Sequence, residues 1–305
     1  MSIPALQNQI RKLLDEKNAI LLAHNYQRPE VQDVADLTGD SLGLSLEAAK
    51  TDAKVIVFCG VHFMAETASI LCPDKLVLLP VVSAGCPMAD MISAPSLIQK
   101  KKELPGVPVV TYVNSSAAVK AETDICCTSA NAIKVVNSLA DSDTVFMDPD
   151  RNLARYTQRF TDKRVLYWEG FCPYHDRLTA EQVNRVKRDY PQALFLAHPE
   201  CRLEVLDLAD EVKSTSGMLD FTRDAQNREF IIGTETGIIH TLQKQSPHKA
   251  FIPADDRMVC IDMKKIELDD IVRTLRTLSP VIEVEENIRV RAYGAVRRML
   301  QVPRD

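Results

Sequence analysis

The sequence has no apolar run long enough to cross a membrane, which takes roughly 20 consecutive residues. Its longest apolar stretches, such as LVLLPVVSAG at 76–85, are much shorter and are typical of buried strands. The N-terminus also lacks a basic segment leading into a long apolar core. We therefore expect neither a membrane span nor a secretory signal peptide.

The chain also has no excess of positive charge. It carries 37 Lys and Arg against 42 Asp and Glu, for a formal net charge of −5. This balance gives no basic surface for nucleic acid. The eight cysteines of a chain that is not exported predict thiols or metal ligands rather than a disulfide framework. Together these absences indicate a protein of the reducing cytoplasm.

What the chain does contain is an alternation of apolar runs and amphipathic segments. We expect strands at 19–24, 54–59, 75–80, 107–114, 143–148, 163–168, 193–198, 229–233 and 250–253. We expect helices at 3–17, 30–37, 41–50, 61–71, 128–139, 151–160, 237–245, 266–278 and 285–300, and one after 214–218. Such alternation predicts an α/β fold with parallel sheets covered by helices.

Three landmarks recur at nearly constant spacing along the chain. Cys86, Cys172 and Cys260 each follow a strand and lie 86 and 88 residues apart. The first strands end at 22–26, 111–115 and 196–200, and serines expected at helix starts stand at 41, 129 and 216. A repeat of this kind predicts three homologous αβα domains with short parallel sheets around a pseudo-threefold axis, with the active site at the centre. We expect domains at 1–100, with the N-terminal helix, at 101–185 and at 186–265, and C-terminal helices at 266–305.

Polar residues gather where ligands of parallel α/β units bind, beyond the carboxyl ends of the strands. The first-strand ends offer His24, Asn25, Tyr26, Tyr112, Asn114, His198 and Glu200. The helix starts offer Ser41, Ser129, Ser214 and Thr215, which we expect to cap their helices. Converging helix N-termini attract anions. We therefore expect a ligand with more than one negative charge, such as a dicarboxylate or a phosphorylated metabolite.

The three spaced cysteines predict a metal site at the axis. Soft thiolate ligands favour an iron–sulfur cluster or zinc. A cluster held by three cysteines keeps one iron open, and that iron acts as a Lewis acid. A closed zinc site needs a fourth ligand, and His175, three residues after Cys172, is available for it. The residues alone leave both metals open.

Nine motifs in order resemble the quinolinate synthase family (type A) over about residues 20–265. They are HNYQRPEVQDVAD (24–36), GDSL (39–42), CPM (86–88), YVNSS (112–116), TSANA (128–132), PDRNL (149–153), HPEC (198–201), STSGM (214–218) and GTETGIIH (233–240). The resemblance implies one 4Fe–4S cluster held by Cys86, Cys172 and Cys260. It implies condensation of iminoaspartate with dihydroxyacetone phosphate to quinolinate, releasing phosphate and water, in de novo NAD biosynthesis. L-Aspartate oxidase or aspartate dehydrogenase would be the functional partner that supplies the imine.

The resemblance also implies roles for individual residues. His24 and Ser41 would hold part of the iminoaspartate, while Tyr112, Asn114 and Ser129 would line the second domain's share of the site. His198 and Glu200 would approach the open iron and the polar groups of the substrate, and Ser214 and Thr215 would bind an anionic group. Tyr26 would belong to a closing lid, and His175 would lie within reach of the cavity. The catalytic set is then Tyr26, Tyr112, His175, His198 and Glu200, with Glu200 and His198 as the pair that moves protons.

Two departures from the family pattern and three alternative functions accompany this prediction. Tyr174 stands where we expect a small aliphatic residue, and Cys260 is followed by Ile261, Asp262 and Met263 rather than by further cysteines. A disulfide switch based on a C-x-x-C-x-x-C run should therefore be absent. The alternatives are an iron–sulfur hydro-lyase acting on a small hydroxy acid, a non-enzymatic iron or oxygen sensor, and a zinc protein. A sensor would need a DNA-binding or partner surface, and the sequence shows no basic helix or winged motif for one.

Overall fold

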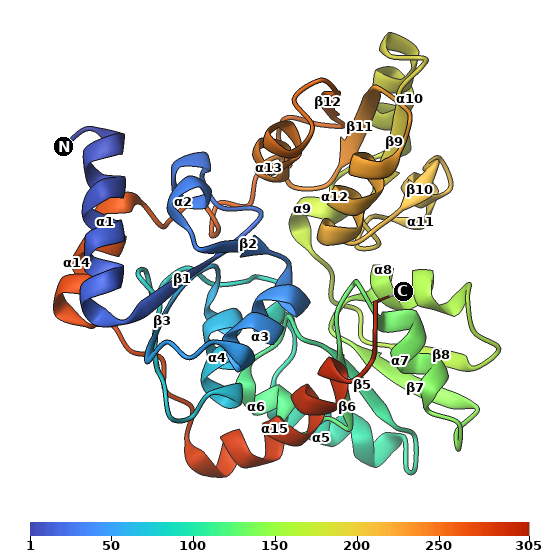
Figure 1. The fold of residues 1–305 in the computed structure, drawn as a ribbon. Coiled ribbons are helices and arrows are strands. Elements are labelled where there is room, and N and C mark those ends of the chain that lie inside the picture. Colours follow the sequence, from blue (N-terminus) through green and yellow to red (C-terminus); the bar gives the residue numbers. More distant parts are fainter. Residues whose placement is uncertain (305) are drawn as a thin grey trace.

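Three four-stranded sheets make up the framework of the part that the computed structural model describes, residues 1–304 (Figure 1). Every strand pairing in them is parallel. The three sheets share one strand order, in which the first strand of each unit lies between its second and third strands. The prediction of an α/β fold with three short parallel sheets is confirmed.

The first unit begins with α1 (Ile3–Lys17), which buries Leu6, Ile10 and Leu14 on one face. Its sheet consists of β1 (Ala19–His24), β2 (Leu37–Gly39), β3 (Val55–Cys59) and β4 (Leu76–Leu78). The helices are α2 (Pro29–Val34), α3 (Ser41–Lys50) and α4 (His62–Leu71), followed by the short 3₁₀ helix η1 (Ala89–Met91). All five residues of β3 are buried, as expected for a central parallel strand.

The second unit repeats this order. Its sheet consists of β5 (Val109–Tyr112), β6 (Ile125–Cys127), β7 (Thr144–Asp148) and β8 (Arg164–Tyr167). The helices are α5 (Ala94–Glu103), α6 (Ala117–Lys120), α7 (Ala132–Ser138), α8 (Arg151–Gln158) and α9 (Pro173–Asp176). Leu97 of α5 packs with Val109 and Phe146 of this sheet, so α5 belongs to the second core.

The third unit has the same plan. Its sheet consists of β9 (Leu194–Ala197), β10 (Glu211–Val212), β11 (Glu229–Gly233) and β12 (Ala250–Pro253). The helices are α10 (Ala180–Asp189), α11 (Leu203–Leu206), α12 (Thr215–Asp224) and α13 (Ile238–Gln245). Val183 of α10 packs with Phe195 and Ile231 in the core of this unit.

The C-terminal helices return to the first two units. α14 (Leu268–Thr277) lies beside α1, and α15 (Glu286–Leu300) packs on α4, α6 and β6 (Figure 1). At the end of α15, the Asn131 Nδ2 donates to the carbonyl oxygens of Met299 and Val302, at 3.1 and 3.2 Å. These bonds fix the chain end to the second unit, while α15 itself packs on both the first and the second.

A repeated hydrogen bond fixes the register of the three units. In each unit an aspartate before the second strand accepts the N–H of a first-strand residue that lies 15 positions earlier. The pairs are Asp36 with Leu21 (2.7 Å), Asp124 with Val109 (2.8 Å) and Asp210 with Phe195 (2.7 Å). This register makes His24, Tyr112 and His198 equivalent, one residue away from the alignment that the strand-end motifs had suggested for the second unit.

The structure corrects the sequence prediction in detail. The second strand of every unit was missed, because it is only two or three residues long, and the predicted helix at 30–37 ends at Val34. α5, α6, α9, α10 and α11 were also missed. Each cysteine of the repeat therefore follows the fourth strand of its unit rather than the third. Among residues 1–304, no helix has the length and apolar character to cross a membrane.

Candidate active site

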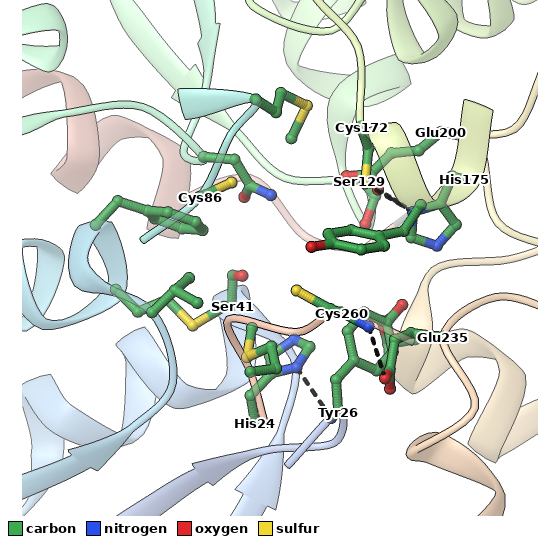
Figure 2. Close-up of a pocket in the computed structure, with 18 of the residues that line it drawn as sticks. His24, Tyr26, Ser41, Cys86, Ser129, Cys172, His175, Glu200, Glu235 and Cys260 are labelled. Carbon is green, nitrogen blue, oxygen red and sulfur yellow. Dashed lines mark hydrogen bonds and ion pairs between the residues drawn. The ribbon is translucent and has the colours of Figure 1, made fainter. Parts of the chain in front are cut away.

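All three units contribute to one cavity, which lies beyond the carboxyl ends of their strands (Figure 2). It contains every residue of the predicted catalytic, substrate-binding and metal-binding sets except one. These are His24, Tyr26, Ser41, Cys86, Tyr112, Asn114, Ser129, Cys172, His175, His198, Glu200, Thr215 and Cys260. Ser214 instead lines a separate groove between the second and third units, so its predicted place in the cavity is not observed.

The three repeated cysteines face one another across this cavity from loops of three different units. Burial raises the pKa of the Cys86 thiol to about 12 and that of Cys260 to about 11. The negative charge of Cys260 contributes to the rise at Cys86. Thiols in this state are protonated at neutral pH, and a metal that binds them must displace their protons. None of the eight cysteines within residues 1–304 forms a disulfide.

Glu200 sits at the centre of a buried polar cluster. Its Oε2 lies 2.7 Å from the Nδ1 of His175 and 3.6 Å from the Nδ1 of His198, whose rings stack at 4.7 Å. Burial alone would raise the pKa of Glu200, but the two imidazoles and a hydrogen bond from Tyr112 lower it to about 2. Glu200 is therefore a carboxylate near neutral pH. Its shorter contact is with His175, not with the predicted partner His198.

Two imidazoles of the cavity, those of His24 and His198, are held neutral. Burial lowers the pKa of His24 to about 4 and that of His198 to about 3. The Nδ1 of His24 accepts the backbone N–H of Tyr26 at 3.1 Å, so the loop itself orients the ring. These two histidines are available as hydrogen-bonding groups without adding positive charge to the cavity.

A chain of hydroxyl groups connects Tyr26 to this cluster. The Tyr26 hydroxyl lies 2.6 Å from the Oγ1 of Thr234 and 3.2 Å from that of Thr215. Thr234 Oγ1 in turn lies 2.8 Å from His175 Nε2. Thr215 was predicted at the site, whereas Thr234 was not. The signal for Thr234 was its place directly after β11, within the GTETG motif.

The predicted capping serines are mostly not caps. Asp40 caps α3 by accepting the N–H of Gly43 at 2.8 Å, and Ser41 is the first helical residue. Ser129 lies ahead of the cap position of α7, which Asn131 occupies. Ser214 does cap α12. The acidic cap places negative charge beside the start of α3, which opposes the binding of an anion there. The N-terminus of α3 therefore does not by itself form an anion site.

Glu235, a fully buried carboxylate that lines the cavity, was not predicted from the sequence. It accepts the backbone N–H of Cys260 at 3.1 Å and that of Gly237 at 2.7 Å. Lys264 Nζ lies 3.0 Å from it and donates to the backbone oxygen of Tyr26. Glu235 therefore connects a cysteine loop to the Tyr26 loop.

Other features of the cavity fit a bound polar ligand and metal. The Oδ1 of Asn114 is buried without a hydrogen-bond partner in the described structure, which leaves an acceptor for a ligand. Tyr174, the departure from the expected pattern, lines the cavity beside Cys172. Possible ligand atoms of Cys172, His175 and Glu200 lie within 4.8 Å of one another.

The fold and the site together define a triplicated α/β protein with a thiol-lined cavity, a candidate metal site, where its three units meet. The family model of the quinolinate synthetase A protein matches residues 8–301. Quinolinate synthase from Geotalea uraniireducens (strain Rf4) is 61% identical over 300 residues, covering 98% of both chains. Quinolinate synthase from Geobacter sp. (strain M21) is 57% identical over all of both chains, and that from Methanoregula boonei is 56% identical over 97% of both. The chain belongs to the quinolinate synthetase A family, as the motifs predicted, and this match disfavours the hydro-lyase and the sensor.

Proposed function

We propose that this chain condenses iminoaspartate with dihydroxyacetone phosphate to give quinolinate, phosphate and water. The observation that carries the proposal is the meeting of one cysteine from each unit at a cavity that also holds Glu200, His175 and His198. The product is an aromatic diacid, so the reaction must remove carbon-bound protons and stabilise leaving oxygens. Iminoaspartate would come from L-aspartate oxidase or aspartate dehydrogenase.

Cys86, Cys172 and Cys260 would hold a 4Fe–4S cluster. The donor set fits, because three soft sulfur ligands from three loops suit a cluster better than a hard cation. When bound, the cluster supplies an open iron that acts as a Lewis acid. The Cys260 ligand would be kept in place by the bond from its backbone N–H to Glu235.

Six polar residues of the cavity would bind the polar groups of the substrates: His24, Ser41, Tyr112, Asn114, Ser129 and Thr215. His24 and Asn114 offer neutral hydrogen-bonding groups, and the free Oδ1 of Asn114 suits an N–H or O–H donor. Ser214 would act from outside the cavity, by capping α12 and so placing Thr215. Tyr26 would close the site through its hydroxyl contacts with Thr215 and Thr234.

Glu200 would move the protons, with His175 and His198 as its partners. It is a carboxylate at neutral pH, and two imidazoles contact it. A positioned general acid–base group contributes roughly 10²–10⁴-fold to the rate. Tyr112, whose hydroxyl bonds Glu200, would share this role or stack on the flat intermediate.

We further propose a cytoplasmic location, in line with the reduced cysteines, none of which forms a disulfide within the described residues. The domains proposed at 1–100, 101–185 and 186–265 need adjustment at two limits. Residues 100 and 185 fall inside α5 and α10, and both helices pack with the unit that follows them.

Anaerobic comparison of Cys86→Ala, Cys172→Ala and Cys260→Ala tests the proposal. We expect each variant to lose most of its iron and its quinolinate formation from iminoaspartate and dihydroxyacetone phosphate. Cys72→Ala is the matched control, because Cys72 is a buried thiol of the first unit that bonds the Ala48 oxygen outside the cavity. Full activity in any of the three, or brown protein that forms no quinolinate, would contradict the proposal.

A further inference from the structure

Cys172, His175 and Glu200 form a compact ligand group that is distinct from the set of three cysteines. One possible ligand atom of each lies within 4.8 Å of the others, and Cys86 and Cys260 fall outside this group. His175 Nδ1 lies 3.2 Å from Cys172 Sγ and 2.7 Å from Glu200 Oε2. We propose that, in the chain without its cluster, these three residues bind one Zn²⁺ ion. This goes beyond the proposed function and does not depend on it.

The local fold brings the three ligands together. Cys172 stands at the N-cap of α9 and His175 lies in the first turn, so both side chains project from the same short segment. Glu200 comes from the loop after β9 in the third unit. The ion would therefore bridge the second and third units.

The charges of this group suit a divalent cation in a buried place. His175 and Glu200 are nearly fully buried. A thiolate and a carboxylate balance the two charges of the ion, so no net charge is buried. One sulfur, one imidazole nitrogen and one carboxylate oxygen are the ligand types that zinc takes, whereas Mg²⁺ and Ca²⁺ prefer oxygen alone.

A neighbouring hydroxyl orients the imidazole as metal sites require. When Nδ1 faces the ion, the proton of the ring is on Nε2, and this N–H donates a hydrogen bond to Thr234 Oγ1, 2.8 Å away. Such outer hydrogen bonds fix the ring and the tautomer of metal-binding histidines. Thr234 is itself held by the Tyr26 hydroxyl at 2.6 Å.

The fourth coordination position would face the cavity. The cavity has about 70 Å³ of free volume, more than the roughly 10–15 Å³ that one water requires. A tetrahedral ion with three protein ligands and one water is the usual form of an open zinc site. Because Cys172 belongs to both sets, zinc in this site would block assembly of a cluster on the three cysteines.

Zinc titration of the full-length, reduced and chelator-treated chain tests the proposal. We expect one Zn²⁺ per chain, and Co²⁺ should give the visible bands of a tetrahedral ion with a thiolate ligand. Cys172→Ala and His175→Ala should weaken zinc binding by more than about 100-fold, whereas Cys86→Ala and Cys260→Ala should stay within about threefold of the unaltered chain. Circular dichroism verifies folding, and Cys172→Ser and His175→Gln replace any variant that fails to fold.

A matched pair of threonines tests the orienting bond. Thr234→Val should weaken zinc binding by about 10–100-fold, because it removes the partner of His175 Nε2. Thr215→Val should leave the affinity unchanged, since Thr215 contacts Tyr26 in the same hydroxyl chain but not His175. Equal losses in Cys86→Ala and Cys172→Ala would assign the zinc to the three cysteines instead. If the chain binds no zinc, or if its zinc affinity does not change in any of these variants, the proposed site is wrong.

Discussion

Glu200 is contacted by side chains from two units, and its chemistry depends on keeping its charge. Glu200→Gln preserves the size of the side chain but removes the carboxylate that His175 contacts at 2.7 Å. We expect turnover to fall by about 10²–10⁴-fold, the usual contribution of a general acid–base group. Iron content and the visible absorbance of the cluster should not change. Glu204→Gln, at an exposed carboxylate of α11, is the control, and full activity of Glu200→Gln would remove Glu200 from this role.

The neutral His24 predicts a loss of stability in acid. Its pKa falls from 6.5 to about 4 in the fold, so between these values the unfolded chain binds a proton that the folded chain does not. The free energy of unfolding must therefore decrease as pH falls through this window, by about 2 kcal/mol from this residue at pH 4.5. In His24→Gln, denaturant titrations between pH 7 and 4.5 should show a correspondingly weaker pH dependence. His248→Gln, at an exposed histidine, should keep the original slope; equal slopes in both variants would count against this account.

Most residues of the site could be predicted, and those that were missed share a cause. The cysteines, the histidines and Glu200 could be recognised in the sequence, because their chemistry is specific and they follow apolar runs. Asp40 and Glu235 look like ordinary surface carboxylates in the sequence. What makes them part of the site is a distant partner, Arg304 for one and Lys264 for the other. Only folding brings such partners together.

At the scale of elements, apolar runs located the long strands, but the short ones gave no signal. β2, β6 and β10 are edge strands of two or three residues, too short to show a periodic pattern. Most of the predicted helices begin within two residues of the observed start, but α7 begins four residues later than predicted, and the predicted caps of α3 and α7 were wrong. Aspartate and serine are nearly equal N-caps, so local sequence does not decide between neighbouring Asp40 and Ser41.

The loop after Cys260 is attached to the loop after β11 by the Lys264–Glu235 ion pair, which we expect to be costly to break. Lys264→Met would leave the fully buried Glu235 without its cation, although Gly237 and Cys260 still donate to it. We expect the free energy of unfolding to fall by about 3 kcal/mol, as for other buried pairs that lose one partner. Denaturant titration of the chain without metal measures this directly.

A double variant and a neighbouring lysine provide the controls for this ion pair. Glu235→Gln combined with Lys264→Met should cost less than the sum of the single changes, because the uncompensated charge is gone. Lys265→Met removes a more exposed lysine that pairs with Asp262, and should cost at most about 1 kcal/mol. Equal costs for Lys264→Met and Lys265→Met would show that the Glu235 pair has no special weight.

For the whole molecule, the repeat was visible in sequence because function and folding both preserve it. The cysteines recur because each unit supplies one to the centre, and Asp36, Asp124 and Asp210 recur because each closes the same turn onto a first strand. The period predicts three units, but it says nothing about how the units are held together. α15, outside the repeat, packs on the first and second units, whereas ion pairs within the repeat, Asp33 with Lys244 and Asp176 with Arg202, join the third unit to the other two.

Asp40 is where the tail meets two units of the repeat. Its carboxylate accepts hydrogen bonds from both Nη groups of Arg304, at 2.5 and 3.0 Å. Burial raises the pKa of Asp40, but the contacts with Arg304 and a hydrogen bond from Ser216 of α12 lower it below its usual value.

Arg304→Gln should lower the free energy of unfolding by about 1–2 kcal/mol, since the arginine itself is about one-third exposed. It should also raise the KM for substrate more than it lowers kcat, because α3 would no longer hold Ser41 firmly at the cavity. Arg304→Lys should recover part of both effects, as a single ammonium cannot make the paired contact. Arg297→Gln, on the exposed face of α15, should change neither quantity; a stable Arg304→Gln with normal KM would mean that the tail is not needed to fix the first unit.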